Sequence, residues 1–256
     1  MSTFPNIHKS FDAAHVLWKQ PAKGNKLFIL CGPSGSGKST LVAKIEEDGF
    51  CKRAPKYSNR AQRVGQVNNL LHVFVKDDII HKNYAFIKEH CDIKYSMYNN
   101  FYGIQTKKIK KILKANKCVI VISNIQALKK VKEAFIDTEI IFILVDNICI
   151  RNLLTAYATR ERLQIFSEDT LMIADNLSNA ISKNNIKKIR YYLDLLKDKM
   201  KAHFAKKEYK EFVKRLEGWI YYRKEFAENK ELFTQAIQGG NLCELYEKLI
   251  QRIKKS

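Results

Sequence analysis

The sequence predicts an α/β fold: a doubly wound, mainly parallel sheet with helices on both faces, plus a helical insertion near the C-terminus. Three observations predict it. Short apolar runs rich in β-branched residues recur with little polar alternation, as expected for strands buried on both faces. Segments of helical periodicity separate these runs, which is the pattern of layered α/β proteins. A glycine-rich loop directly follows the first run and leads into a helix.

The N-terminal part begins with an extension and continues into the first strand. Residues 1–25, with a short helix at Phe11–Trp18, are expected to pack on the sheet. The first strand is predicted at Leu27–Cys31, and the helix after the glycine-rich loop at Ser39–Glu47. The stretch from 52 to 66 is polar and basic, and we expect it to be a loop that faces a ligand.

The middle of the chain alternates apolar runs with helical patterns. Strands are predicted at Leu70–Val75, Cys118–Ile122 and Ile140–Val145, and helices at Asp77–Glu89 and Thr106–Ala115. The first of these helices opens with two acidic residues, which suits the positive end of a helix dipole. Between the two helices lies an aromatic, amide-rich segment, residues 95–103.

The C-terminal part is mostly helical. Residues 148–181 show a helical pattern with a polar break at 159–169. Residues 186–228 predict two amphipathic helices, with apolar stripes at Ile186, Ile189, Leu193, Leu196, Met200 and Phe204 and at Tyr209, Phe212, Val213, Leu216 and Ile220. A strand at Phe233–Gln238 and a helix at Asn241–Ile253 complete the fold.

The composition limits the classes of function. The 256 residues carry a formal net charge of +20, which favours anionic partners: nucleotides, nucleic acid or an acidic surface. The six cysteines are scattered without a C-x-x-C pair, so we expect reduced thiols rather than a zinc site or disulfides. With no apolar run long enough to span a bilayer and no apolar signal segment, we expect a soluble, cytoplasmic protein without a transmembrane segment.

The most specific feature is the segment G-P-S-G-S-G-K-S-T at residues 32–40, which matches the phosphate-binding loop pattern G-x-x-x-x-G-K-[ST]. Its glycines allow successive N–H groups to point into one hollow, and the next helix adds its positive end. Lys38 is expected to reach the β and γ phosphates of a nucleoside triphosphate, and the Ser39 hydroxyl to bind Mg²⁺. The fold is therefore of the P-loop NTPase type. The expected nucleotide-binding residues are Gly32, Ser34, Gly35, Ser36, Gly37, Lys38, Ser39 and Thr40.

Two later groups of residues suit a second phosphate. Arg60 and Arg63, three residues apart, can fork around one phosphate with charge-assisted hydrogen bonds. The Tyr102 hydroxyl can donate to the same group. Taken alone, these residues are better explained as a solvated surface pair and a core tyrosine.

The order of these features resembles the guanylate kinase family over residues 26–185 and 229–256. The phosphate loop is very close to that of the family, and Asn100-Phe101-Tyr102-Gly103 is similar to its N-Y-Y-G. The resemblance implies that Arg60, Arg63 and Tyr102 hold the acceptor phosphate. Ser58 stands where the family has a small hydroxyl residue.

The chain departs from the family where the base is recognised. Ile93, with Asp92 beside it, stands where the family has the glutamate that reads guanine, and Ile104 replaces a small hydroxyl residue. Ile122 and Asn124 replace two aspartates ahead of Gln126. Guanine specificity is therefore in doubt. An apolar residue after Tyr-Gly also occurs in the related ribose bisphosphate phosphokinases, which makes a sugar phosphate a second candidate acceptor.

The resemblance implies a phosphoryl transfer from ATP with Mg²⁺ to a phosphate-bearing small molecule. Arg160 or Arg162 would close over the γ phosphate from a lid at residues 157–169, and residues 51–104 would form the acceptor-binding subdomain. Residues 186–228 would be a helical insertion, and 229–256 the last strand and helix of the core.

Two other functions remain open. One is a nucleotide-bound module with weak catalysis, which uses its basic surface to bind nucleic acid or a protein partner. The dense lysines of residues 183–210, with Trp219, Tyr221 and Tyr222 nearby, would suit nucleic acid, although lysine-rich helix faces are usually solvated surface. The other is an enzyme that phosphorylates a nucleic-acid end. The oligomeric state is not indicated.

Overall fold

The structure of the protein is a computed structural model. It describes residues 26–33, 35–60, 73–74, 80–97, 100–122, 124–145, 150–161, 166–204, 206–238 and 241–255. The expected N-terminal extension, residues 1–25, lies outside the described residues. No helix in the described ranges is long and apolar enough to cross a membrane.

A five-stranded sheet forms the centre of the molecule, in the order β2-β7-β1-β8-β9. Its strands are β1 (Lys26–Cys31), β2 (Lys52–Arg53), β7 (Cys118–Val121), β8 (Glu139–Val145) and β9 (Gln235–Ile237). All four neighbouring pairs are parallel. The crossover connections expected from alternating strands and helices are therefore present, and the predicted doubly wound α/β fold is confirmed.

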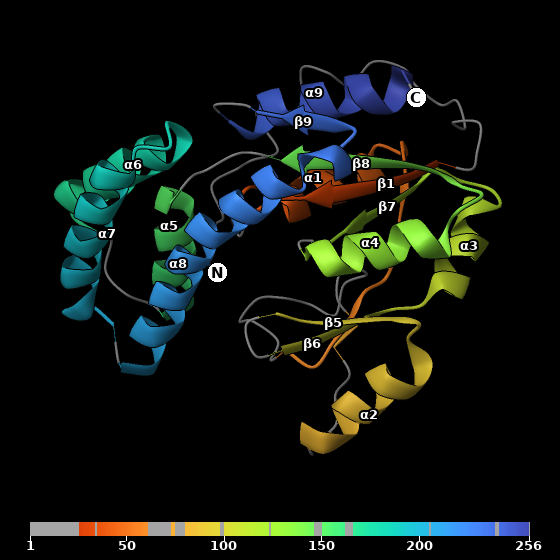
Figure 1. Cartoon of the computed structure of the whole chain (residues 1–256), viewed down its shortest axis with the longest axis horizontal. Coiled ribbons are helices and arrows are strands. Elements are labelled where there is room, and N and C mark those ends of the chain that lie inside the picture. Colours follow the sequence, from red (N-terminus) through yellow and green to blue (C-terminus); the bar gives the residue numbers. More distant parts are fainter. Residues whose placement is uncertain are drawn as a thin grey trace.

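Both faces of this sheet are covered by helices. Successive residues of β1 alternate between two apolar clusters: Leu27 and Ile29 pack with α3 (Thr106–Leu113) and α4 (Ile125–Ala134), whereas Phe28 packs with α1 (Lys38–Glu47) and α9 (Leu242–Lys255). In Figure 1, α9 lies above the sheet and α4 below it. Because both faces are buried, the central strands need no polar alternation, which explains their continuous apolar sequence.

A second, smaller sheet has the order β4-β3-β6-β5. It contains β3 (Tyr57–Ser58), β4 (Val73–Phe74), β5 (Ile93–Met97) and β6 (Asn100–Ile104), and α2 (Ile80–His90) contacts β3 and β6. The expectation of a loop from residue 52 to 66 was wrong at β2 and β3, and the aromatic segment forms two paired strands. Strands of two residues are too short to show an alternating pattern of polar and apolar residues. Their pairing partners, β7 and β6, also lie far away in the sequence.

The remaining helices lie to one side of the sheet, at the left of Figure 1. They are α5 (Ile150–Glu161), α6 (Glu168–Ser182), α7 (Ile186–Lys201) and α8 (Lys206–Glu228), followed by the short 3₁₀ turn η3 (Lys230–Leu232). Most of their buried apolar residues form one cluster, whereas Phe226 near the end of α8 belongs to a cluster of the central sheet. The helices expected as an insertion, α7 and α8, therefore share a core with α5 and α6. Within the predicted stripe of α7, Ile186 is an exception because its side chain is 61% exposed.

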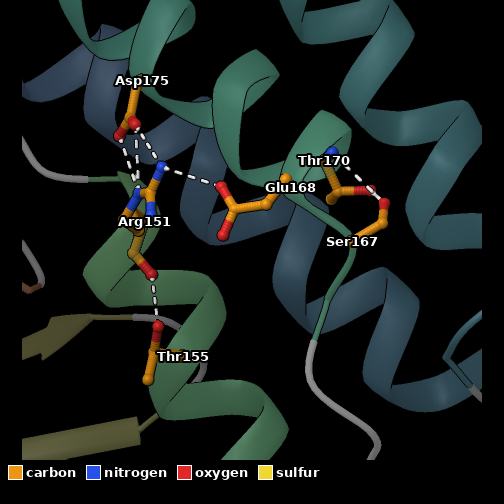
Figure 2. A network of polar contacts seen from close by, with 6 residues as sticks. All are labelled: Arg151, Thr155, Ser167, Glu168, Thr170 and Asp175. Atoms are coloured by element: carbon orange, nitrogen blue, oxygen red, sulfur yellow. Dashed lines mark hydrogen bonds and ion pairs between the residues drawn. The ribbon is translucent and has the colours of Figure 1, made fainter.

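A polar network fixes the start of α6 against α5 (Figure 2). The Arg151 guanidinium donates to both carboxylate oxygens of Asp175, with its shortest contact at 2.7 Å, and lies 4.0 Å from Glu168. The Ser167 hydroxyl accepts from the backbone N–H of Thr170, which is an N-cap. The polar break predicted near residues 159–169 is therefore the junction between two helices.

The packing of α7 leads to a stability prediction. Leu196 is fully buried in the cluster of α5–α8, so Leu196→Ala is expected to lower the free energy of unfolding by about 2–5 kcal/mol, through lost burial and a residual cavity. Urea unfolding followed by circular dichroism measures the change. Ile186→Ala on the same helix is the matched control and should change stability by about 0.5 kcal/mol or less. Equal losses in the two variants would contradict the described orientation of α7.

Candidate functional site

The glycine-rich loop connects the end of β1 to the start of α1 and bends at three glycines with positive φ: Gly32, Gly35 and Gly37. At Gly32 a Cβ atom would lie 2.4 Å from the Val145 carbonyl oxygen at the end of β8. At Gly37, the N-cap of α1, it would lie 2.4 Å from the Leu242 side chain of α9. Side chains at these positions would therefore push the loop away from the sheet or from α9.

Lys38 lies at the first position of α1 with its side chain almost completely buried. Its ammonium group donates to the Pro33 carbonyl oxygen and, at 2.9 Å, to the Ser36 hydroxyl oxygen. Burial lowers the pKa of Lys38 to about 8. The first turn of α1 contains no acidic residue, so the positive end of the helix dipole adds to the charge of Lys38. This arrangement fits a triphosphate, whose oxygens are stronger acceptors than the neutral oxygens of the loop.

The residues of this loop also fit Mg²⁺, but with few protein ligands. Ser39 is exposed in the first turn of α1, where its hydroxyl can provide one ligand. Among the described residues, no group of three or more His, Cys, Asp or Glu side chains could hold a metal. Ile122 is buried, and the Asn124 side chain accepts from the N–H of Ala127 as the N-cap of α4. A Mg²⁺ ion here would therefore take most of its ligands from phosphate oxygens and water.

The residues expected to bind the acceptor phosphate lie on the second sheet. Ser58 of β3 pairs directly with Tyr102 of β6, and both side chains are buried. The backbone N–H of Arg60 donates to the Ser58 hydroxyl at 3.1 Å, so this serine also shapes the turn that carries the arginine. The structure therefore brings Ser58, Arg60 and Tyr102 together. Arg63 lies outside the described residues, as does Ser34 of the phosphate loop.

Lys56 is a buried residue of the site that sequence reasoning missed. It precedes β3, its side chain is 7% exposed, and its ammonium group donates to the Val121 carbonyl oxygen at 2.9 Å. The ammonium also lies 5.5 Å from the centre of the Tyr102 ring. Burial, followed by repulsion from Lys38 and Arg60, lowers the pKa of Lys56 to about 7. The only feature of the sequence that indicated burial of Lys56 was its pair of uncharged neighbours, Pro55 and Tyr57.

The lid arginines stay a prediction. Helix α5 ends at Glu161, and the structure describes neither the side chain of Arg160 nor residue Arg162.

The residues that stand where the family recognises the base have structural roles in this protein. Ile93 and Ile104 are opposite each other in β5 and β6, and both are buried in the apolar cluster below the central sheet. The Asp92 carboxylate accepts from the backbone N–H and the hydroxyl of Thr106, both at 2.7 Å, at the start of α3. These hydrogen bonds lower the pKa of Asp92. One carboxylate oxygen of Asp92 is thus used by Thr106, and a role of Asp92 in reading a base stays a prediction.

The parallel sheet, the strand-loop-helix unit and the buried Lys38 define a P-loop α/β protein. The family model described as guanylate kinase matches residues 24–188. The chain therefore belongs to the guanylate kinase family, as its motifs predicted.

Relatives in this family are distant. The guanylate kinase of Sulfurimonas denitrificans is 33% identical over 100 residues, which cover 38% of this chain and 47% of the relative. That of Thiobacillus denitrificans is 32% identical over 128 residues, 48% of this chain and 59% of the relative. The chain thus spans about half the length of the curated relatives it matches.

A solved structure supports the fold over a longer range. The crystal structure of guanylate kinase from Anaplasma phagocytophilum superimposes on this chain with a TM-score of 0.52 at 14% sequence identity. The superposition covers 92% of this chain and 87% of the guanylate kinase chain. At this identity the likeness establishes a shared fold.

The close approach at Gly32 leads to a second prediction. Gly32→Ala places a Cβ against the Val145 carbonyl, so the loop must move away from the end of β8. We expect the affinity for ATP, measured by isothermal titration calorimetry, to fall about tenfold or more, because misplaced N–H groups lose charge-assisted hydrogen bonds worth about 1.5 kcal/mol or more each.

Gly49→Ala is the matched control for this variant. Gly49 also has a positive φ, of 77°, but a Cβ there would meet nothing within 4 Å. It should cost about 1–2 kcal/mol of stability and leave the affinity for ATP unchanged. A Gly32→Ala protein that binds ATP like the wild type would show that the loop does not need this close approach.

Proposed function

We propose that the protein is a nucleotide kinase of the guanylate kinase type, which transfers the γ-phosphate of ATP to a phosphate-bearing small molecule. The observation that carries the proposal is the position of the buried Lys56 ammonium between the two sheets. It donates to the Val121 carbonyl at the end of β7, which pairs with β1, the strand before the phosphate loop, and it lies 5.5 Å from the centre of the Tyr102 ring on the second sheet. A donor phosphate on the loop and an acceptor phosphate beside Tyr102 would therefore be neighbours, which is the main requirement of phosphoryl transfer.

In this proposal the residues divide into a donor side and an acceptor side. Lys38 and the loop N–H groups bind and orient the triphosphate of ATP, with Ser39 as a ligand of Mg²⁺. When bound, Mg²⁺ neutralises charge on the phosphate oxygens. Arg60 and Tyr102 hold the acceptor phosphate, together with the predicted contributions of Ser58 and Arg63. Arg160 or Arg162 would exclude water from the site when the lid closes.

The acceptor is GMP or another nucleoside or sugar phosphate. GMP is supported by family membership. A different acceptor is supported by the apolar, buried Ile93 and Ile104, since a pocket that reads a base through hydrogen bonds loses discrimination steeply when its partners are replaced.

The described cysteines are all free, and free thiols together with a need for ATP fit a cytoplasmic location.

A transfer assay tests this function and identifies the acceptor. Radiolabelled ATP is supplied with GMP, other nucleoside monophosphates, sugar phosphates or oligonucleotides carrying a free end. We expect labelled product with at least one monophosphate. Lys38→Ala should reduce turnover by about 10²–10³-fold, because it removes a buried cation from the transferred group. Lys107→Ala, at an exposed lysine of α3, is the matched control. Unchanged turnover in Lys38→Ala would end the kinase proposal.

Arg60 provides a separate test of the acceptor side. Arg60→Ala is expected to raise the KM for the acceptor by about 10- to 100-fold, since a hydrogen bond between charged groups contributes about 1.5–3 kcal/mol. The KM for ATP should change little. Steady-state kinetics with each substrate varied in turn measures both constants. If only the KM for ATP rose, Arg60 would belong to the donor side.

A second candidate function is the binding of nucleic acid by a catalytically weak P-loop module. It is favoured by exposed lysines on and beside α7, including Lys187, Lys188 and Lys199, and by the exposed Tyr191 on the same helix. Fluorescence anisotropy with labelled oligonucleotides at several salt concentrations tests it. Binding with a steep salt dependence, without transfer to any acceptor of the panel, would favour this function over the kinase.

A further inference from the structure

The carboxyl end of β7 carries a buried cation instead of a carboxylate. The Lys56 ammonium donates to the carbonyl of Val121, the last residue of that strand. Ile122, the next residue, is apolar and buried, and the Asn124 side chain is used as a helix cap. Lys56 thus occupies the edge of the sheet at which ligands of parallel α/β proteins bind.

This cation has no acidic partner among the described residues. The buried charged side chains of the described residues are all basic: Lys38, Lys56, Lys117 and Arg215. The electrostatic effects on Lys56 come from Lys38 and Arg60, and both oppose its charge. Its three N–H protons have one hydrogen-bond acceptor within the described part of the chain, the Val121 carbonyl oxygen. Burial of an ammonium under these conditions is costly unless an anion compensates it.

A second polar group near the same ring, the Tyr95 hydroxyl, has no hydrogen-bond partner among the described residues. The Tyr95 ring stacks on the Tyr102 ring, with centroids 5.2 Å apart, while the Lys56 ammonium lies near the same Tyr102 ring. The Tyr95 hydroxyl is buried and makes no hydrogen bond to any described residue. Buried hydroxyl groups are normally paired, so this donor is available to a ligand atom beside Tyr102.

We propose that Lys56 is a third phosphate-binding cation of the site, whose ammonium contacts the phosphate oxygens at the junction between the donor triphosphate and the acceptor phosphate. The proposal rests on the proposed function, because the junction exists only if Lys38 serves the donor and Arg60 the acceptor. Its position fits this role: Lys56 is affected by both cations and contacts the ring of Tyr102. It would supply positive charge where the phosphoryl group moves.

A purely structural role for Lys56 would be to hold the Val121 carbonyl. The chain offers a matched case of such a role in Lys117, just before β7. The Lys117 side chain is equally buried, at 7% exposed, and its ammonium donates to the Ile253 carbonyl oxygen at 2.8 Å. In contrast to Lys56, whose electrostatic neighbours are both cations, Lys117 lies within electrostatic range of an ion pair, Lys26 with Glu139. Lys117 is thus a buried ammonium that holds a carbonyl away from the phosphate loop and from Arg60.

The experiment measures the binding of inorganic tripolyphosphate and of MgATP to the full chain by isothermal titration calorimetry. Lys56→Gln removes the charge but keeps an N–H donor for the Val121 carbonyl. We expect it to weaken tripolyphosphate binding by about 10- to 100-fold, as for the loss of one hydrogen bond between charged groups. Its melting temperature should be equal to or above that of the wild type, because an uncompensated buried charge is removed. Lys56→Arg should retain most of the affinity, and Lys117→Gln should bind like the wild type.

The pH dependence gives a readout that a structural role would not produce. Lys56 is faced by Lys38 from α1, by Arg60 beyond β3 and by Tyr102 from β6. Without an anion its pKa is about 7, and a bound anion raises that pKa. Binding thus takes up a proton above pH 7. The advantage of the wild type over Lys56→Gln should be full at pH 6 and should shrink as the pH rises to 8.5.

The outcomes distinguish this proposal from the proposed function. The role of Lys56 would be overturned if Lys56→Gln bound tripolyphosphate as tightly as the wild type. It would also be overturned if the variant had a lowered melting temperature and the ratio of wild-type to variant affinity stayed constant with pH. Either result would count even if transfer to an acceptor is observed. Conversely, a wild type that binds tripolyphosphate through Lys56 but transfers phosphate to no acceptor would refute the kinase and leave the anion site. Should Lys56→Gln not fold, the pH series is run on Lys56→Arg, whose high pKa must remove the part of the dependence that Lys56 causes, so that its affinity relative to the wild type rises between pH 6 and 8.5.

Discussion

The parallel pairing of β1 between β7 and β8 is the constraint on which the site depends. Because the three strands run in one direction, their carboxyl ends meet at one edge of the sheet. The phosphate loop leaves from the end of β1, the Val145 carbonyl at the end of β8 limits the loop at Gly32, and the Val121 carbonyl at the end of β7 holds Lys56. Three backbone ends thus position the loop and both buried lysines.

The charge distribution at this edge lowers stability for the sake of function. Burial lowers the pKa of Lys38 to about 8 and that of Lys56 to about 7, and repulsion from Lys38 and Arg60 adds to the shift of Lys56. Neither ammonium pairs with a carboxylate among the described residues. Between pH 7 and 10.5 the Lys56 side chain binds fewer protons in the folded state than in the unfolded state. Its destabilising effect on the fold is therefore full below pH 7 and decreases as the pH rises to 10.5. If phosphate binds at Lys56 as proposed, it removes this penalty and couples ligand binding to folding stability.

The sequence was informative where the physics is local. The strand-loop-helix unit, the central strands and the amphipathic helices follow from glycine positions and from periodicity within one segment, and their predicted bounds lie close to those of β1, α1 and α7. The two-residue strands β2 and β3 could not be predicted, since they exist only through pairing with β7 and β6. Lys56 was missed for the same reason: burial of a lysine in a basic stretch depends on residues 46 and 65 positions away, Tyr102 and Val121.

The two halves of the site differ in how far they constrain the ligand. In the proposed function, the donor half would recognise phosphate through backbone N–H groups and Lys38, which any triphosphate satisfies. The acceptor half would combine Arg60 and Tyr102, which again suit a phosphate, with the apolar and buried Ile93 and Ile104. One carboxylate oxygen of Asp92 is already used by two hydrogen bonds from Thr106. Under this proposal, selection of the acceptor would act mainly through its phosphate and its shape.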